Sequence, residues 1–372
     1  MRIIMDGMPL LGRKTGIGYY VENLYNNLSR FNELNLELLC NGIGFSKSID
    51  VDNYTLRKAP FPYDLYRTKS NNKLLYNTFQ IETFIGRFDV FHGTNYVLLP
   101  TRRAKKVVTI HDLSFIKHPE FVPKSIVDHH TEWSKYAANE SDLIIVDSFS
   151  TGKDLQQYFG VKESKIVCIH LAASPNYCLR KPENVEYIRG VYGLPSKFIL
   201  FVGTIEMRKN VINMIKAYAE ARNKYQIEHK LVLIGGKGLG YDEVLHTVTQ
   251  LKLENYVLFP GYIKENDLPK IYNLASLFIY ISIYEGFGLP VLEAMQSGIP
   301  VITSNCSSLP EVVEQAGIQT DPYDVNEIAL EIARVIQDEE IRSDLIAKGL
   351  KQAAKFSWES TASKTYEVYK GL

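Results

Sequence analysis

Short apolar runs alternate with amphipathic stretches along the chain, and this pattern predicts its secondary structure. Runs that predict buried strands lie in the first half at residues 2–6, 36–40, 89–91, 106–110 and 142–146, and in the second half at residues 197–202, 231–234, 256–259, 277–283 and 301–304. Between them apolar residues recur at helical spacing, as in Ile17, Val21, Leu24 and Leu28. Strands that alternate with helices predict parallel sheets and an α/β fold.

The length of 372 residues is too great for one core of ordinary size and predicts two domains. Residues 171–195 hold three prolines and no strand pattern, so we place the linker near residues 172–185. This predicts an N-terminal domain over residues 1–175 and a C-terminal domain over residues 186–356. Residues 324–356 have a helical pattern, and a final helix is expected from Trp358 to Leu372.

Composition excludes several classes of protein. Lys plus Arg and Asp plus Glu both number 42, so we expect no nucleic-acid partner. The N-terminus has no apolar run long enough for a signal peptide or a membrane span, and four dispersed cysteines suit reduced thiols, so we expect a cytoplasmic protein. Peripheral contact with the inner face of a membrane stays open, because residues 102–106 are basic, although a solvated loop explains them too. Nothing in the sequence defines an oligomeric state.

Residues 277–300 carry the clearest chemical signal. The predicted strand leads into the loop Glu285 to Gly288 and then a helix from Pro290, where proline suits the first helical position. Such a loop brings backbone amides and a helix N-terminus to one point, which predicts an anion site. Glu285, before the helix, and Glu293, expected in its first turn, suit neutral hydroxyl groups better than a phosphate. A diphosphate beside hydroxyl-rich rings indicates a nucleotide sugar.

A second basic loop, GTIEMRKN at residues 203–210, follows the strand predicted at residues 197–202. Arg208 and Lys209 are expected at the start of the next helix, where the helix dipole disfavours positive charge. A bound diphosphate would explain this placement, and a solvated basic loop is the alternative. The run GGKGLG at residues 235–240 is either a turn or another ligand-facing loop, with Lys237 as a candidate.

Polar residues in the N-terminal half follow predicted strands, at the edge where parallel sheets bind ligands. They are Asn95 in FHGTNY, His111 and Asp112 in HDLSF, and Ser148 in VDSFSTGKDL. A histidine at a strand end is often only a satisfied polar residue, and we keep this alternative for His111. Thr151 with Asp154 predicts a helix cap. In the predicted loop GRKTGIG, Gly16 and Gly18 would let the backbone approach a ligand.

The run EGFGLPVLEAMQSGIPVI, preceded by GTIEMRKN, resembles the signature of the family-4 retaining glycosyltransferases. The resemblance is strongest from residue 200 to 312, and it departs from the family pattern at Met207, where proline is usual. It implies the GT-B fold, with two Rossmann-like, doubly wound parallel-sheet domains that face a central cleft. The C-terminal helix, about residues 357–372, would cross back to the first domain. The first domain would lie on the acceptor side, and the second would bind the nucleotide-sugar donor.

The same resemblance implies a retaining hexosyl transfer and roles for named residues. Arg208, Lys209 and loop amides can neutralise a diphosphate, and we expect no Asp-x-Asp motif in the chain to hold a divalent ion, so we expect no metal and no cofactor. The catalytic residues would be His111, Glu285, Arg208 and Lys209. The donor would contact Gly16, Gly18, Gly203, Thr204, Arg208, Lys209, Tyr262, Glu285, Gly286, Phe287, Gly288, Leu289, Glu293, Ser308 and Leu309. The acceptor side would include Asp112, Ser148 and Asn95.

The HDLSF run at residues 111–115 resembles a subgroup that includes mannosyltransferases of bacterial surface polysaccharide synthesis. It implies GDP-mannose as the donor, with UDP-glucose or a related UDP-sugar next, and a glycan or lipid-linked oligosaccharide as the acceptor. A nucleotide-sugar epimerase on the same fold is an alternative from another class. It would need a titratable pair that abstracts and returns a proton, and it would not depend on an acceptor. A nucleotide-sugar-binding protein without turnover is a third possibility.

Overall fold

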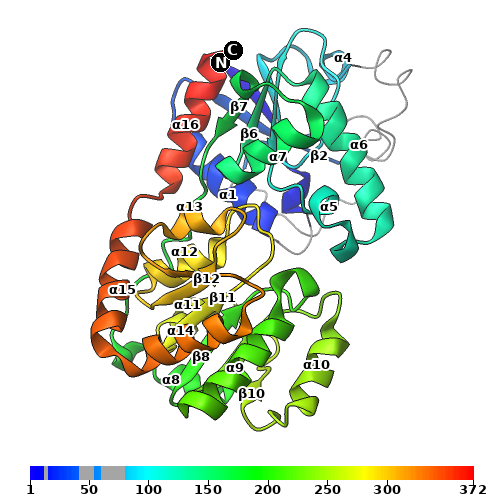
Figure 1. Cartoon of the computed structure of the whole chain (residues 1–372). Coiled ribbons are helices and arrows are strands. Elements are labelled where there is room, and N and C mark those ends of the chain that lie inside the picture. The colour runs from blue at the N-terminus through cyan, green and yellow to red at the C-terminus, as the bar shows by residue number, and fades with distance from the viewer. Residues whose placement is uncertain (12–15, 42–53, 60–79) are drawn as a thin grey trace. The chain divides into compact units, whose positions relative to one another are not determined.

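The computed structural model describes residues 1–11, 16–41, 54–59 and 80–372, and this part of the chain divides into two compact units (Figure 1). The first unit comprises Met1–Leu171 together with Trp358–Leu372, and the second comprises Ala172–Ser357. Residues 172–185, where we expected the linker, belong to the second unit.

The first unit is built on a parallel sheet with the strand order β3-β2-β1-β4-β5-β6-β7 among the described residues. Strand β1 is an interior strand, because Ile3 pairs with Leu36 of β2 on one side and with Val90 of β4 on the other. The order therefore reverses between β1 and β4. The strands are β1 (Arg2–Asp6), β2 (Asn35–Asn41), β3 (Leu56–Ala59), β4 (Val90–Gly93), β5 (Lys105–Ile110), β6 (Leu143–Val146) and β7 (Ile166–Cys168).

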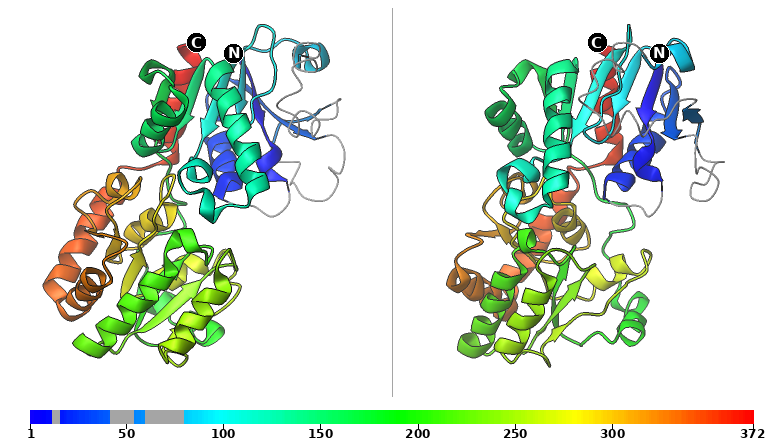
Figure 2. Two further views of the ribbon diagram at one scale, coloured as in Figure 1. Left: turned by 45° about the vertical axis from the view of Figure 1, so that its right-hand side comes forward. Right: turned by 90° about the vertical axis from the view of Figure 1, so that its right-hand side faces the viewer.

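Helices connect these strands, and the C-terminal helix returns to pack among them. Helix α16 (Trp358–Lys370) lies against α1 (Gly16–Leu28) and runs alongside the strands of this unit in both views of Figure 2. Its Tyr369 hydroxyl is 2.6 Å from Nδ1 of His92 in β4. The predicted return of the last helix to the first domain is thus confirmed. The other helices are α4 (Glu82–Ile85), α5 (Ser114–Lys117), α6 (Lys124–Glu140) and α7 (Phe149–Phe159), with short 3₁₀ turns η1 (Met8–Leu10), η4 (Pro119–Phe121) and η5 (Glu163–Lys165).

The second unit has the strand order of a Rossmann fold. Its parallel sheet runs β10-β9-β8-β11-β12-β13, so the first strand of the unit, β8, lies between the second and the fourth. Leu277 of β11 pairs with Ile199 of β8, and Phe198 of β8 pairs with Lys230 of β9. The strands are β8 (Phe198–Val202), β9 (Lys230–Ile234), β10 (Val257–Leu258), β11 (Leu277–Tyr280), β12 (Val301–Ser304) and β13 (Ile318–Thr320).

The helices of the second unit form two groups. Helix α9 packs against α10 and α14, whereas α12 packs against α13 and α15. Crossovers that turn in opposite directions from β8 would place such groups on opposite faces of the sheet. The helices are α8 (Tyr187–Tyr192), α9 (Val211–Tyr225), α10 (Tyr241–Gln250), α11 (Leu268–Tyr272), α12 (Leu289–Gln296), α13 (Leu309–Val313), α14 (Val325–Gln337) and α15 (Glu339–Ala353), with 3₁₀ turns η6 (Pro182–Asn184) and η7 (Met207–Lys209).

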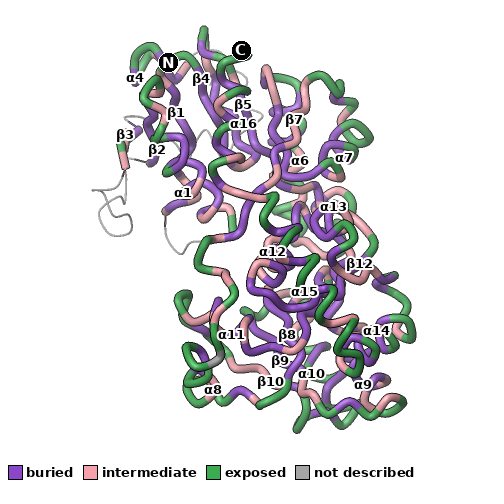
Figure 3. Tube along the Cα trace, turned by 90° about the vertical axis from the view of Figure 1, so that its left-hand side faces the viewer, coloured by how far each residue is buried: buried purple, intermediate pink, exposed green. Residues whose placement is uncertain are grey.

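Burial explains why apolar runs predicted the central strands. Every residue of β8 and β11 is buried, as expected for parallel strands covered on both faces, and Figure 3 shows the buried segments gathered on the strands of each unit. The predicted doubly wound α/β fold is confirmed. Some details differ: β3, β7 and β13 were not among the predicted strands, β11 ends at Tyr280 rather than at residue 283, and residues 324–356 form two helices. The helices separate at Asp338, whose carboxylate accepts hydrogen bonds from the first amides of α15.

Candidate active site

The candidate site lies in the second unit, where the strand order reverses between β8 and β11. These strands are parallel neighbours, so the chain leaves both of them at the same edge of the sheet. Residues 203–209 follow β8, and the loop that carries Glu285 follows β11. This reversal point is where ligands bind in open α/β sheets. The two motifs predicted separately from the sequence therefore meet.

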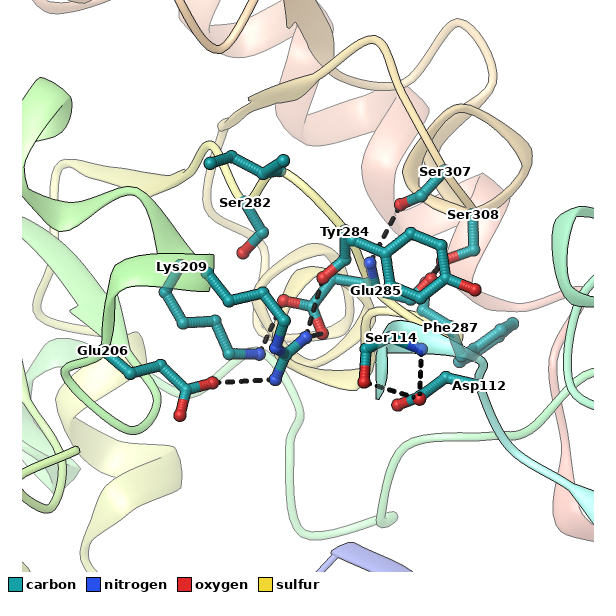
Figure 4. A network of polar contacts seen from close by, with 12 residues as sticks. Asp112, Ser114, Glu206, Lys209, Ser282, Tyr284, Glu285, Phe287, Ser307 and Ser308 are labelled. Carbon is teal, nitrogen blue, oxygen red and sulfur yellow. Dashed lines mark hydrogen bonds and ion pairs between the residues drawn. The ribbon is translucent and has the colours of Figure 1, made fainter. Parts of the chain in front are cut away.

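Two cations and two carboxylates form a compact cluster at this point (Figure 4). Lys209 Nζ donates to Glu285 Oε1 at 2.5 Å, and Arg208 Nη1 donates to Glu285 Oε2 at 3.2 Å. Arg208 Nη2 also donates to Glu206 Oε1 at 2.8 Å. The formal charges balance, because Arg208 and Lys209 face Glu206 and Glu285. We call this group the 206–285 cluster.

Burial makes the charges of the 206–285 cluster depend on one another. Burial alone would raise the pKa of Glu285, but Lys209 and Arg208 lower it to about 2. Burial lowers the pKa of Lys209, and Glu285 opposes that change. Glu285 is thus ionised at every physiological pH, and each buried charge has a partner.

The predicted location of the two cations is partly wrong. Arg208 and Lys209 lie in the 3₁₀ turn η7, and Asn210, with φ of 57°, separates them from the start of α9. The turn lets their side chains reach Glu285 instead of extending along the helix.

The loop after Glu285 is held by residues 305–309. Ser308 Oγ donates to the carbonyl oxygens of Glu285 and Phe287 at 3.0 and 2.8 Å, and Ser307 Oγ accepts from the Glu285 amide at 3.0 Å (Figure 4). Gly288 has φ of 110°, and a Cβ there would lie 2.6 Å from Cδ2 of Leu309. Among the described residues no side chain caps α12. Pro290 has no N–H, and the Val291 and Leu292 amides donate to Gly288 O at 3.0 and 3.4 Å, so within the described chain only Leu289, of the first four residues of the helix, has an amide left for an anion.

The GGKGLG run, residues 235–240, packs against the basic loop at residues 203–209 and forms hydrogen bonds with its backbone. The Ile205 amide donates to Gly236 O at 2.8 Å, and the Met207 amide donates to Leu239 O at 2.9 Å. A Cβ on Gly235 would collide with the carbonyl oxygen of Gly203, so the two loops approach closely only because this residue is glycine. Residues 235–240 therefore act as a structural turn against residues 203–207.

Glu293 lies apart from the 206–285 cluster. It is the fifth residue of α12, so its predicted place in the first turn is wrong, because the helix begins at Leu289. Tyr272 donates from its hydroxyl to Glu293 Oε2 at 2.9 Å. Burial raises the pKa of Glu293 to about 7. The two glutamates of the motif therefore differ in charge near neutral pH.

The other donor-side candidates of the second unit differ in exposure. Thr204 is exposed, and Tyr262 is 72% exposed, which excludes the core position that was one alternative for this tyrosine. Gly203, Gly286 and Leu289 are half-buried. Phe287 and Leu309 are buried. All of them follow β8, β10, β11 or β12, at the same edge of one sheet.

In the first unit, His111 is held from both sides of its ring. Its Nδ1 lies 2.7 Å from Asp147 Oδ2, and its Nε2 lies 3.0 Å from Thr94 O. Burial alone would lower the pKa of His111, but the Asp147 carboxylate raises it above its ordinary value. Both ring nitrogens are therefore satisfied within this unit, as the structural alternative for this histidine expected.

Asp147 was missed by the sequence analysis, although the sequence contains a signal for it. Ile110 of β5 pairs with Val146 of β6, so His111 and Asp147 are the first residues beyond a registered pair. Two polar residues that each follow a strand by one position meet when the strands are parallel neighbours.

The acceptor-side candidates also have local structural roles. Asp112 Oδ1 accepts from the amide and hydroxyl of Ser114 at 2.9 and 2.8 Å (Figure 4). Ser148 Oγ accepts from the Thr151 amide at 3.1 Å and caps α7, so the predicted cap by Thr151 and Asp154 is wrong. Asn95 Oδ1 is buried and has no hydrogen-bond partner among the described residues.

Two further expectations need correction. Gly16 and Gly18 lie in the first turn of α1 rather than in a loop before it, and residues 12–15 lie outside the described residues. The sequence also contains one Asp-x-Asp triplet, Asp50 to Asp52, so the expectation that the chain has none is wrong. It lies outside the described residues too, so the expected independence from metal stays a prediction.

Comparisons with known proteins identify the family. A model of glycosyltransferase family 4 matches residues 14–176, and a model of the glycosyl transferases group 1 matches residues 187–352. The O-antigen chain mannosyltransferase B of Escherichia coli is 33% identical over 387 aligned positions that cover all of both chains. The chain belongs to glycosyltransferase family 4. It is therefore an enzyme that transfers a sugar from a donor to an acceptor.

Solved structures agree with the fold of this glycosyltransferase. Sucrose-phosphate synthase from Thermosynechococcus elongatus aligns with a TM-score of 0.78 at 19% identity, covering 100% of this chain and 98% of the other. Anabaena HepE, solved in complex with UDP and glucose, aligns with a TM-score of 0.76 at 18% identity over all of both chains. The two parallel-sheet units thus have the GT-B fold. Within the described ranges, no helix is both long and apolar enough to span a membrane.

Proposed function

We propose that this glycosyltransferase is a retaining, metal-independent mannosyltransferase of bacterial surface polysaccharide synthesis. It would move mannose from GDP-mannose to a glycan or a lipid-linked oligosaccharide. The observation that carries the proposal is the 206–285 cluster, which places two cations beside the N-terminus of α12. Similarity over the full length to the E. coli mannosyltransferase supports the choice of mannose.

The cations of the cluster would bind the diphosphate of the donor. Arg208 offers a forked set of donors and Lys209 a point charge, and together with the positive end of the α12 dipole they would stabilise the negative charge that grows on the leaving group. A diphosphate that takes up the cations would compete with Glu285 for them. The carboxylate of Glu285 would then accept hydrogen bonds from hydroxyl groups of the sugar, as Glu293 would from the ribose.

The reaction would break one bond and form another at the anomeric carbon. The bond from this carbon to the phosphate oxygen breaks, and its electron pair leaves on GDP. The acceptor hydroxyl oxygen bonds to the same face of the carbon, which retains its configuration, and the acceptor proton passes to the leaving phosphate oxygen. Exclusion of water protects the donor from hydrolysis.

The residues of the first unit would serve the sugar and the acceptor. We assign His111 to the transferred sugar, with Asp147 fixing its ring, and Asp112, Ser148 and Asn95 to the acceptor side. The unpartnered amide oxygen of Asn95 supports this, because a buried acceptor without a partner favours a ligand that donates to it.

A UDP-sugar is the alternative donor. It is favoured by HepE, which has the same fold and was solved with UDP and glucose. An epimerase on this fold would turn over donor without an acceptor, so a requirement for acceptor separates it from a transferase.

Thermal unfolding with a panel of nucleotides tests the proposal, because a ligand that binds only the folded state raises Tm. We expect GDP and GDP-mannose to raise Tm, with and without EDTA, and GDP release to require an acceptor. A shift with UDP species alone would replace GDP-mannose by a UDP-sugar. A shift abolished by EDTA would contradict metal independence, and no shift with any nucleotide would contradict the donor site.

A further inference from the structure

We propose that Tyr280 is a positioning residue, whose hydroxyl holds the Lys209 ammonium in place to receive the diphosphate. This inference rests on the proposed function, and it adds a residue that lies outside both donor motifs. Tyr280 is the last residue of β11, and it is 1% exposed.

The geometry leaves one hydrogen-bond donor of Lys209 for a ligand. Lys209 Nζ donates to the Tyr280 hydroxyl and to Glu285 Oε1, both at 2.5 Å. The same nitrogen lies 5.0 Å from the centroid of the Tyr280 ring. An ammonium group has three N–H donors, and partners within the described part of the chain engage two of them, which leaves the third. The Lys209 side chain is 10% exposed. Its nitrogen therefore lies at the end of a nearly buried chain of methylene groups.

Aromatic packing fixes the position of the Tyr280 hydroxyl. The Tyr280 ring stacks on Phe201 of β8 at 5.7 Å and on Phe278 at 5.9 Å, with interplanar angles of 19° and 16°. All three rings belong to the central strands of the sheet. The hydroxyl is therefore attached to a ring that is packed within the central strands of the unit.

A fixed hydroxyl matters because the lysine side chain is flexible. Four methylene groups give Lys209 many rotamers, and ordering them upon ligand binding would weaken the affinity. Two partners that hold the ammonium before the ligand arrives remove much of this cost. A phenylalanine would pack equally well in this apolar strand, so packing alone does not explain the hydroxyl, whose burial is unfavourable without a partner.

Affinity for GDP and UDP, measured by calorimetry, tests the inference. We expect Tyr280→Phe to weaken binding of whichever diphosphate the wild type binds by about tenfold to a hundredfold, the size of one lost hydrogen bond to a charged group. Tyr218→Phe is the matched control. Tyr218 is fully buried in the same unit, and its hydroxyl donates to His229 O at 2.8 Å, so its loss should leave the affinity within about twofold.

A double-mutant cycle separates positioning from a general structural effect. If Tyr280 acts through Lys209, Tyr280→Phe should have no further effect on affinity in a Lys209→Gln background. An equal effect in both backgrounds would overturn the inference. Normal binding by Tyr280→Phe would also overturn the inference if the wild type binds the diphosphate and Lys209→Gln binds it weakly. That result would leave the proposed function intact. A wild type that binds neither diphosphate would overturn both.

A spectroscopic measurement covers the case in which Tyr280→Phe does not fold. In ¹⁵N-lysine-labelled wild type, the Lys209 ammonium should give a resonance protected from solvent exchange, identified by its loss in Lys209→Gln. A wild type without this protected signal would contradict the inference.

Discussion

The 206–285 cluster and the His111–Asp147 pair are both groups of ionisable side chains at the ends of parallel strands, but they differ in whether a ligand could replace one of their partners. In the cluster, Lys209 keeps one N–H beyond its two partners, and α12 has no side-chain cap among the described residues. In the pair, Asp147 and Thr94 occupy both nitrogens of His111. The first arrangement can exchange partners with an anion, whereas the second keeps one ring in one orientation.

Removing both cations should give the largest effect. We expect Arg208→Ala with Lys209→Ala to lower kcat/KM at least about a thousandfold, roughly 4 kcal/mol, because both donors to the leaving diphosphate are lost. Lys216→Ala, at an exposed position of α9, is the control and should keep full activity. Steady-state kinetics measure both. Full turnover by the double variant would rule out the phosphate assignment.

Breaking the pair in the first unit should instead act on stability. Asp147→Asn removes the charge that faces His111 and should lower the free energy of unfolding by about 3 kcal/mol, with lower turnover and unchanged affinity for the nucleotide. Asp154→Asn is the comparison. Asp154 is also buried, but its partner Lys117 is 35% exposed, so solvent reduces the loss. Urea unfolding measures both variants, and equal losses would show that the His111 pair is not special.

Between pH 5 and pH 7.5 the free energy of unfolding should depend on pH through Glu293, whose pKa is about 7, and not through Glu285, whose pKa is about 2. Glu293 has its pKa raised from 4.5 to about 7, so the folded state keeps a proton that the unfolded state loses. Its contribution is therefore fully present below pH 4.5 and declines by about 3 kcal/mol as the pH rises through 7. In Glu293→Gln the decline should disappear. Urea unfolding at pH 5 and pH 7.5 measures it, and an unchanged difference in the variant would assign the effect to other groups.

Local sequence predicted the fold, because the fold depends on contiguous patterns, whereas the donor-binding roles of single residues stay predictions. Apolar runs located the central strands, and GTIEMRKN and the glutamate motif contain every ionised member of the 206–285 cluster. Pairing across the sheet was not predicted, since it depends on register. That is why Asp147 and Tyr280 were missed, although each lies at the end of a strand that had been located. The predicted first residues of helices were the other source of error. A shift of one residue changes which side chain caps the helix, as at α7, where Ser148 is the cap.

Ser148 should give the smallest effect, and it has two possible roles, as the cap of α7 or as a contact for the acceptor, which predict different results. As the cap of α7, Ser148 accepts from the Thr151 amide, and Ser148→Ala should lower the free energy of unfolding by about 1 kcal/mol. Its side chain is fully buried, so if Ser148 acts only as the cap, the KM for the acceptor should stay unchanged. Thermal unfolding and acceptor kinetics on the same preparation separate the roles. A raised acceptor KM with unchanged stability would instead support the acceptor-side assignment, and the first unit would then also contain a group that exchanges partners with a ligand.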